Sequence, residues 1–222
     1  MFSVIILAGG SSTRMNGINK QLAPLEGIPV AVRSALAFER SPLVEEIILA
    51  APRGEEQDYR ALMQEHLVTK LKSVTTGGAT RFLSVKNALP ECACDYIAIH
   101  DGARPLISTE DIGRVLNDAV NYGASIAAAP VTDTIKKCSP NGIVESTPDR
   151  STLYAAQTPQ AFRRELYLSC VERLGSRADG LTDDSSLLEL CSEEVHITPV
   201  TACNMKVTRP QDLAIAAAVL RR

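Results

Sequence analysis

SVIILAGGSSTRM, at residues 3–15, joins a short apolar run to a loop of glycine, serine and threonine. A continuous apolar and β-branched run of this length is typical of a strand that is buried on both faces of a parallel sheet. Residues 3–7 are therefore expected to form the first strand of an α/β sheet. The loop that follows should lie at the carboxyl end of that strand, where ligands bind in open α/β sheets.

The same strand signature returns along the chain, with helical periodicity in between. Further strands are expected at residues 44–49, 71–75, 96–99 and 125–128, and helices at residues 28–38, 55–66, 81–89 and 111–122. This alternation predicts a Rossmann-like three-layer sandwich with a mostly parallel central sheet and helices on both faces. Helical periodicity is expected to return from Pro159, before a last strand at 195–198 and a last helix at 210–220.

The alternation breaks after Pro130. Residues 131–156 contain short β-like pieces around the turn SPNG at residues 139–142, which predicts a projecting β-hairpin arm. Because its apolar residues are sparse, the arm is expected to need a partner surface, and a two-fold dimer is the simplest source of one. We therefore expect a single domain over residues 1–222, with residues 131–156 as a dimerisation arm.

Length and composition favour a globular protein and argue against nucleic acid as a partner. The 222 residues lie between one and two domains of about 150 residues. A content of 45% hydrophobic and 22% charged residues excludes wholesale disorder. The net charge of −3 gives no general electrostatic attraction to nucleic acid, and the absence of tryptophan leaves few rings for base stacking.

The sequence has no sign of a membrane or secretory segment. No apolar run approaches the roughly 20 residues of a membrane helix, and the N-terminus lacks the basic region of a signal peptide. The six cysteines are scattered without the C-x-x-C spacing of zinc or iron–sulfur sites, so we expect reduced thiols. A cytoplasmic enzyme or binding protein is the expectation.

The loop between Gly9 and Lys20 has the composition of a phosphate site. Its glycines and hydroxyl residues can bring backbone N–H groups close to a phosphate, and Arg14 and Lys20 add two positive charges. The loop matches neither the G-x-x-x-x-G-K-[ST] motif of NTPases nor the G-x-G-x-x-G motif of dinucleotide-binding enzymes. A surface turn with two solvated bases is the simpler alternative.

The segment after residues 96–99 holds the best candidate for a metal ligand. Asp101 follows a buried strand directly, and Mg²⁺ commonly takes one or two carboxylates together with substrate phosphates. Arg104 could clamp an anion or pair with Asp101. His100 is better explained as a structural hydrogen-bonding residue than as a general base. Since no nucleophile motif is present, covalent catalysis has little support.

At this point the sequence resembles the 2-C-methyl-D-erythritol 4-phosphate cytidylyltransferase family of the non-mevalonate isoprenoid pathway. The resemblance runs from residue 4 to residue 213. The first motif also occurs in many sugar-nucleotide and molybdopterin nucleotidyltransferases, whereas the ordered set is far more specific. The motifs are LAGGSSTRM, NKQ, GGATRFLSV, HDGARP, PVTDTIK, DRSTLYAAQTPQAF, LTDDSSLLE and NMKVTRPQDL.

The resemblance implies a role for each matching position. Arg14 and Lys20 would be catalytic, by stabilising charge on the α-phosphate of CTP, and Asp101 would hold Mg²⁺ beside the nucleotide. The nucleotide pocket would be formed by Ala8, Gly9, Gly10, Gly78, Ser84 and Asp101. The residues that would bind methylerythritol phosphate are Arg104, Thr134, Arg150, Thr158, Thr182 and Lys206, with Thr134 and Arg150 reaching across a homodimer from the arm.

Two positions depart from the family pattern. Ala79 stands where some members have an acidic residue, and the six positions from Arg14 to Lys20 are a shorter spacing than in other members.

The implied reaction is attack of the substrate phosphate on the α-phosphorus of CTP, with pyrophosphate as the leaving group. Such chemistry depends on positioning and charge neutralisation more than on a base.

Other functions remain open at this point. A ribitol 5-phosphate cytidylyltransferase shares most of the motifs, and a molybdopterin guanylyltransferase shares the first one. A non-catalytic nucleotide sensor could use the same fold. An NAD-dependent oxidoreductase is disfavoured because the G-x-G-x-x-G loop and its acidic ribose partner are missing.

Overall fold

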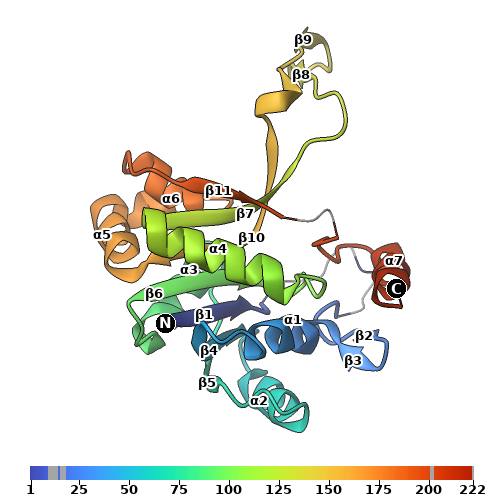
Figure 1. Ribbon diagram of the computed structural model, residues 1–222, viewed down its shortest axis with the longest axis vertical. Coiled ribbons are helices and arrows are strands. Elements are labelled where there is room, and N and C mark those ends of the chain that lie inside the picture. The colour runs from blue at the N-terminus through green and yellow to red at the C-terminus, as the bar shows by residue number, and fades with distance from the viewer. Residues whose placement is uncertain (10–14, 16–18, 201–202, 222) are drawn as a thin grey trace.

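The computed structural model describes residues 1–9, 15, 19–200 and 203–221. A seven-stranded sheet crosses the molecule in the order β11-β7-β10-β6-β1-β4-β5 (Figure 1). Neighbouring strands pair in parallel, except that β10 is antiparallel to both β6 and β7. The strands are β1 (Phe2–Leu7), β4 (Val44–Ala51), β5 (Leu71–Thr76), β6 (Tyr96–Asp101), β7 (Ala124–Pro130), β10 (Tyr154–Arg163) and β11 (His196–Pro199).

Helices cover both faces of this sheet and give the three layers that the sequence predicts. One face carries α1 (Val30–Glu39), α2 (Glu56–Glu65) and α4 (Thr109–Tyr122). The other carries α3 (Arg81–Ala88), α5 (Arg164–Leu174) and α6 (Ser185–Leu190). A last helix, α7 (Pro210–Leu220), packs on the small hairpin of β2 (Pro24–Leu25) and β3 (Ile28–Pro29). Short 3-10 turns are η2 (Leu89–Glu91), η3 (Arg150–Thr152) and η4 (Gly175–Ala178).

The burial of β1 explains why its sequence is apolar throughout. Side chains alternate across a strand, so Val4 and Ile6 contact the layer of α1 and α4, whereas Ile5 and Leu7 contact the layer of α3 and α5. Each buried aliphatic side chain of this size contributes about 1.5–3 kcal/mol to folding. Because both faces are covered, β1 is fixed in the middle of the sheet, and the loop after it emerges at a defined edge.

Strand β10 corrects the expectation that helical periodicity returns at Pro159. Residues 154–163 form a ten-residue strand instead, and the helix begins only at Arg164. The pairing with β7 shifts register between Ala156 and Gln160, which leaves Pro159 in a bulge where its missing N–H costs no ladder bond. Ala161 and Phe162 are buried in the centre of the sheet, so tertiary packing decides this strand.

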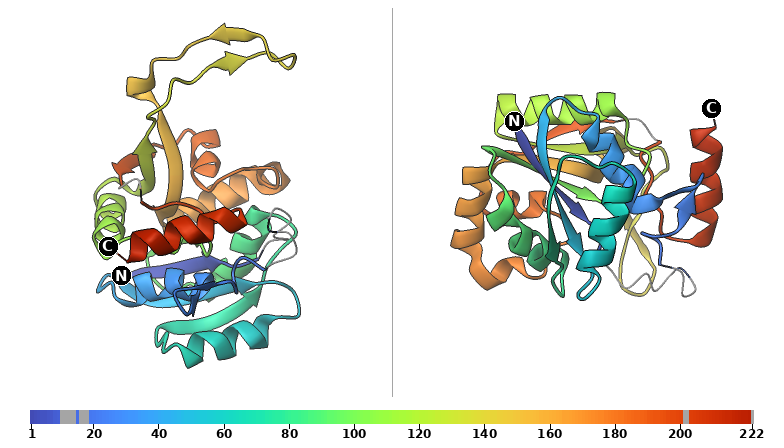
Figure 2. Two further views of the ribbon diagram at one scale, coloured as in Figure 1. Left: turned by 90° about the vertical axis from the view of Figure 1, so that its right-hand side faces the viewer. Right: turned by 90° about the horizontal axis from the view of Figure 1, so that it is seen from below.

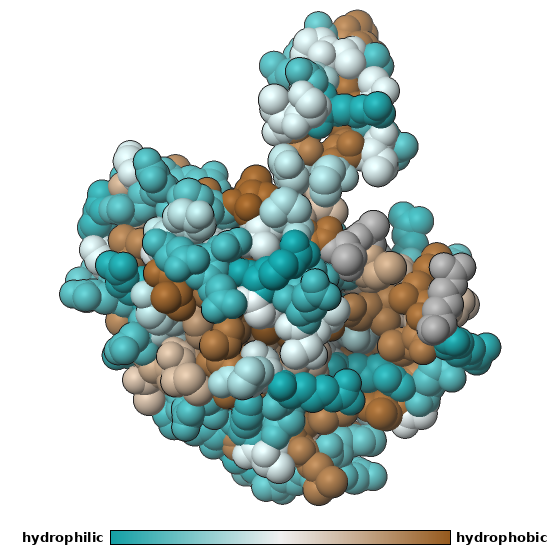
Figure 3. Space-filling view, viewed as in Figure 1, coloured by the Kyte–Doolittle hydropathy of each residue, from teal (hydrophilic) through white to brown (hydrophobic). Residues whose placement is uncertain are grey.

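The arm projects from the sheet as expected (Figure 2). Strands β8 (Lys137–Cys138) and β9 (Val144–Ser146) form its hairpin, and Gly142 takes the positive φ of +78° that the turn requires. Residues 154–156, expected in the arm, instead pair with β7 in the central sheet. The arm exposes the large apolar side chains Ile135, Ile143 and Val144, and it stands clear of the body in the space-filling view (Figure 3).

Two general expectations concern membranes and cysteines. Across the described residues, we find no helix with both the length and the apolar character that crossing a membrane requires. All six cysteines belong to the part of the chain that the structure describes, and all six are free thiols.

Candidate nucleotide site

A pocket of about 340 Å³ opens at the carboxyl ends of β1 and β6, the edge of the sheet where ligands bind in α/β folds. Predicted residues from five separate segments meet there. Those that line the pocket are Gly9, Lys20, Gly78, Ser84, Asp101, Thr182 and Lys206. A larger depression of about 780 Å³ lies at the opposite end of β6, beside Tyr96 and Arg164, and contains none of the predicted residues. We therefore place the site at the first pocket.

The glycine turn before α3 is held by two hydroxyl groups. Thr80 caps the helix by accepting a hydrogen bond from the Leu83 N–H at 3.2 Å. The Ser84 hydroxyl donates to the Thr80 carbonyl at 2.9 Å and accepts from the Gly78 N–H at 3.0 Å. Ser84 thus lines the pocket and also fixes the backbone of the turn.

Gly78 has no room for a side chain. A Cβ there would lie 2.4 Å from the Cβ of Leu83 and 3.0 Å from the backbone nitrogen of Ser84, both within α3. The turn therefore needs glycine at this position for steric reasons. The close approach also brings the backbone to the pocket wall, where a nucleotide could contact it.

Gly78→Ala is expected to weaken nucleotide binding and also to destabilise the fold. Relief of the clash must push the turn away from α3, at a cost of about 1–3 kcal/mol in the free energy of unfolding. We expect the KM for CTP to rise at least about tenfold, because the displaced backbone lines the pocket. Steady-state kinetics and thermal unfolding check this, with Gly113→Ala as the control, since a Cβ at Gly113 meets open space. An unchanged KM would show that nucleotide does not touch this turn.

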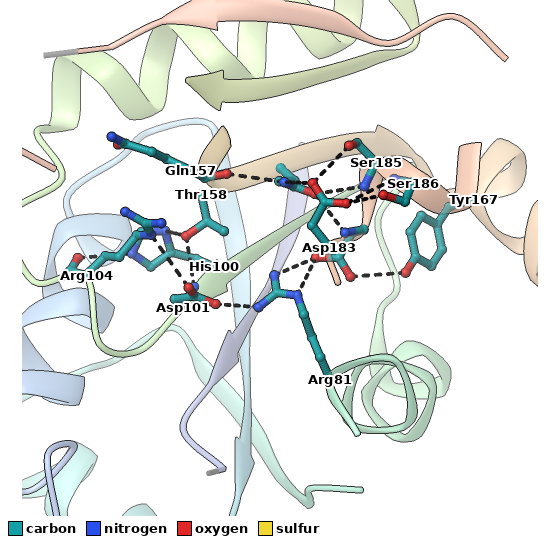
Figure 4. A network of polar contacts seen from close by, with 12 residues as sticks. Arg81, His100, Asp101, Arg104, Gln157, Thr158, Tyr167, Asp183, Ser185 and Ser186 are labelled. Carbon is teal, nitrogen blue, oxygen red and sulfur yellow. Dashed lines mark hydrogen bonds and ion pairs between the residues drawn. The ribbon is translucent and has the colours of Figure 1, made fainter. Parts of the chain in front are cut away.

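Asp101 is surrounded by positive charge. Lys206 Nζ lies 2.7 Å from its Oδ2. Arg104 Nε lies 3.6 Å from the same oxygen, and Arg81 pairs with Oδ1 (Figure 4). Burial alone would raise the pKa of the Asp101 carboxyl, but the charges of Arg81, Lys206 and Arg104 outweigh it and hold the pKa well below its ordinary value. Asp101 is therefore ionised at every physiological pH.

A chain of hydrogen bonds through Thr158 connects Asp101 to His100. The Asp101 N–H donates to the Thr158 hydroxyl at 3.0 Å, and that hydroxyl lies 3.0 Å from His100 Nδ1. Burial lowers the pKa of His100 to about 3, so the ring is neutral. Its Nε2 faces the Arg104 carbonyl at 3.2 Å, which can only accept, and so Nε2 carries the proton while Nδ1 accepts from Thr158. His100 thus has the structural role that the sequence predicts.

Thr158 differs from its expected role in the kind of contact it makes. Its side chain is buried, and its hydroxyl is engaged with Asp101 and His100. Its carbonyl accepts a 2.8 Å hydrogen bond from the Asn204 amide. These contacts favour a residue that positions Asp101, and direct contact with substrate stays a prediction.

A segment near the C-terminus delivers Lys206 to the site. The Val207 N–H donates to the Ala103 carbonyl at 2.8 Å, and Arg104 Nη1 donates to the Asn204 carbonyl at the same distance. These bonds tie residues 203–208 to the loop that follows β6. Arg104 and Lys206 therefore lie on the same side of Asp101 although 102 positions separate them in the sequence.

Lys20 reaches the pocket from a tight turn. The backbone N–H groups of Leu22 and Ala23 donate to the Asn19 carbonyl, and the Gln21 N–H donates to the Asn19 side chain at 3.0 Å. Gln21 is buried, and its Oε1 has no hydrogen-bond partner among the described residues. The carbonyl and the side chain of Asn19 thus fix the backbone of the turn that carries Lys20.

The remaining predicted residues lie elsewhere. Ala8 is buried at the end of β1, where its N–H donates to the Ala50 carbonyl. Thr134 and Arg150 are exposed in the arm, and Arg150 Nη1 donates to the Thr132 carbonyl within the arm at 2.8 Å. Gly10 and Arg14 fall outside the described residues, so their predicted roles stay predictions.

Sequence reasoning gave no role to Arg81 and Asp184. Arg81 is part of the motif GGATRFLSV, and nothing in that stretch of sequence indicates a partner for its charge. In the structure its Nη2 lies 2.6 Å from Asp184 Oδ2 while its Nη1 pairs with Asp101. The partners are 103 and 20 positions away in the sequence, so no local pattern could reveal them.

Fold and site together define the class of protein as a nucleotidyltransferase. The pocket presents backbone turns for a nucleotide and fixed cations for phosphates, which is what chemistry at phosphorus requires. The family model described as 2-C-methyl-D-erythritol 4-phosphate cytidylyltransferase matches residues 2–222. The chain belongs to this family.

Individual relatives agree with the family model along the whole chain. A protein of that name from Geobacillus kaustophilus is 41% identical over 222 residues, covering 99% of this chain and 96% of the relative. One from Dehalococcoides mccartyi is 38% identical, covering 98% and 95%. The crystal structure of 4-diphosphocytidyl-2C-methyl-D-erythritol synthase from Anaerococcus prevotii is 28% identical and superposes with a TM-score of 0.87, covering 100% of this chain and 98% of that one.

Proposed function

We propose that this protein transfers CMP from CTP to 2-C-methyl-D-erythritol 4-phosphate and releases pyrophosphate. The observation that carries the proposal is the cluster of Lys206, Arg104 and Arg81 around Asp101, in the same pocket as Lys20 and the glycine turn. This cluster lies in a chain that belongs to the cytidylyltransferase family over residues 2–222.

The pocket residues suit in-line transfer at phosphorus. An oxygen of the acceptor phosphate forms a bond to the α-phosphorus of CTP, and the bond from that phosphorus to the bridging oxygen of pyrophosphate breaks. Lys20 stabilises the charge that gathers on the α-phosphate oxygens. Lys206, Arg104 and Thr182 hold the acceptor phosphate. The acceptor is already an anion, and so no residue needs to remove a proton from it.

Asp101 is the carboxylate that would hold magnesium, and the ion would share it with Arg81 and Lys206. Within the described residues no three His, Cys, Asp or Glu side chains gather into a metal cage, so protein ligands alone would hold the ion poorly. Mg²⁺ commonly relies on one or two carboxylates plus substrate phosphates, and the ionised Asp101 at the pocket wall supplies one. When bound, the ion would neutralise charge on the triphosphate.

The arm is the basis for proposing a homodimer. It projects from the body and exposes apolar side chains at Ile135, Ile143 and Val144. The predicted substrate residues Thr134 and Arg150 belong to the arm, and neither lines the pocket of its own chain. A second copy of the chain would cover the apolar side chains and bring an arm to each pocket.

The cytoplasm is the proposed location of the enzyme, because its six free thiols would stay reduced there.

Mixing two inactive variants tests the shared site. Arg150→Ala and Lys20→Ala are each expected to lose most activity, and a mixture should regain about a quarter of the wild-type sites. The reason is that half of the dimers are mixed, and one site in each mixed dimer then has both Lys20 and Arg150. Pyrophosphate release after subunit exchange measures this, and each variant exchanged with itself is the control. If the mixture stays as inactive as its components, the arm does not serve the neighbouring site.

Pyrophosphate release also tests the proposed reaction. CTP, ATP, GTP and UTP are supplied in turn with Mg²⁺, and methylerythritol phosphate and ribitol 5-phosphate are compared as acceptors. We expect release only with CTP and methylerythritol phosphate. Release with ribitol 5-phosphate instead would reassign the acceptor, and release with GTP would contradict the cytidylyl specificity.

A further inference from the structure

Arg81 joins two carboxylates that come from distant segments of the chain. Its Nε and Nη2 both donate to Asp184 Oδ2, at 3.1 and 2.6 Å, while Nη1 donates to Asp101 Oδ1 (Figure 4). Asp101 ends β6, and Asp184 is the residue before α6. One guanidinium therefore fixes the distance between the end of a central strand and the segment that carries Thr182.

The Asp184 end of this bridge is firmly attached to the sheet. The N–H groups of Asp184 and Ser185 both donate to Gln160 Oε1 at 2.9 Å, and Gln160 belongs to β10. Tyr167 on α5 lies 3.4 Å from the other oxygen of Asp184. With a side chain only 2% exposed, Asp184 would be a costly isolated charge, so the segment depends on Arg81 for compensation.

The Arg81 end is attached to the nucleotide turn. Arg81 is the first residue of α3, directly after the Thr80 cap and three residues before Ser84, which holds the Gly78 backbone. A displacement of the Arg81 side chain therefore involves Asp101 and the segment 182–184 together, whereas the Thr80 and Ser84 hydroxyls hold the glycine turn itself. Arg81 differs in this from Lys206, whose side chain is 37% exposed and pairs with Asp101 alone among the ion pairs of the described residues.

We infer that Arg81 is a positioning residue for the transfer reaction, which holds Asp101 and the Thr182 segment in one rigid arrangement so that the nucleotide and the acceptor phosphate are aligned. This inference rests on the proposed function. Arg81 lines the pocket, but its three guanidinium nitrogens all donate to protein carboxylates, so Arg81 acts through these partners. A lysine could not replace it, because one ammonium lacks the planar fork that spans two carboxylates.

The role predicts a particular division between kinetic constants. Arg81→Gln should lower kcat about 10²-fold, since a misplacement of about 1 Å between reacting groups costs that much. The KM for the acceptor should rise about tenfold as the Thr182 segment loosens, whereas the KM for CTP should change less than about threefold, because Thr80 and Ser84 still hold the nucleotide turn. Arg81→Lys should recover less than a tenth of the wild-type kcat.

A double substitution separates positioning from simple stabilisation. Arg81→Gln combined with Asp184→Asn replaces the buried ion pair by two neutral amides, and Tm should recover most of what Arg81→Gln alone loses. If Arg81 positions Asp101, kcat stays low in the double variant. If the pair only stabilises the fold, kcat and Tm recover together, and the inference is wrong.

A matched control comes from a second arginine with a buried carboxylate partner. Arg114 pairs with the buried Asp111 on α4, outside the pocket lining. Arg114→Gln should lower Tm without changing either KM or kcat. An Arg81→Gln variant that behaves in the same way would overturn the inference.

Asp184→Asn tests the inference if the Arg81→Gln variant does not fold. If Arg81→Gln does not fold, Asp184→Asn alone keeps the size of the side chain and should raise the acceptor KM about tenfold with the KM for CTP unchanged. Wild-type acceptor kinetics in Asp184→Asn would also contradict the inference. Failure of the proposed function is a separate result, since the wild-type protein would then release no pyrophosphate.

Discussion

Replacing Lys20 by alanine should lower kcat about 10²- to 10³-fold with little change in stability. Lys20 lines the pocket beside Gly9 and brings a positive charge to it. Removing one preorganised donor to a developing oxyanion typically costs about this much in turnover. The carbonyl and the side chain of Asn19 hold the turn around Lys20, so the loop is expected to keep its shape in the variant. The KM for CTP should rise far less than kcat falls, because the contribution belongs to the transition state.

The measurement is pyrophosphate release at saturating CTP and acceptor, with thermal unfolding in parallel. Lys86→Ala is the matched control, since Lys86 is an exposed lysine on α3 that does not line the pocket. A Lys20→Ala variant with wild-type kcat would remove Lys20 from the catalytic machinery. A large rise in the KM for CTP with kcat unchanged would make it a binding residue only.

Asp101→Asn has the second largest expected effect, and it acts on both activity and stability. The substitution leaves Arg81, Lys206 and Arg104 facing a neutral amide, and loss of one partner from a buried charge cluster costs about 3 kcal/mol. Turnover should fall more than about 10²-fold, because the proposed metal loses its protein ligand and the three cations lose their common partner. Loss of both activity and stability would show that Asp101 serves the reaction as well as the fold.

Titration with Mg²⁺ separates the two causes. CTP binding by calorimetry should strengthen with Mg²⁺ in the wild-type protein and respond much less in Asp101→Asn. Asp118→Asn is the control, because Asp118 accepts a hydrogen bond from Thr198 in the edge strand β11 and does not line the pocket. An equal Mg²⁺ response in wild type and Asp101→Asn would rule out Asp101 as the metal ligand.

The carboxyl edge of the sheet was readable from the sequence because the signal there is local. An apolar β-branched run followed by glycine and charge marks the ends of β1 and β6; Lys20 lies in the loop after β1, and Asp101 is the last residue of β6. The resemblance to a known family then added Thr182 and Lys206, which local patterns alone could not assign. All four line the pocket.

What could not be predicted depends on contacts between distant segments. Strand β10 reads as a turn and a helix start because Pro159 interrupts it with a residue that cannot donate to a sheet ladder, and its place between β6 and β7 makes it a strand. The ion pair of Arg81 with Asp184 could not be predicted for the same reason, because it joins residues that are 103 positions apart in the sequence.

The position of β10 has a consequence for how the chain is synthesised. β6 and β7 are not neighbours in the sheet, and the strand between them comes from residues 154–163. A nascent chain that ends before residue 154 therefore exposes two apolar strand edges with open hydrogen-bonding groups, which are prone to wrong pairing. The sheet can close only after the arm has been translated, so the centre of this fold is completed late on the ribosome.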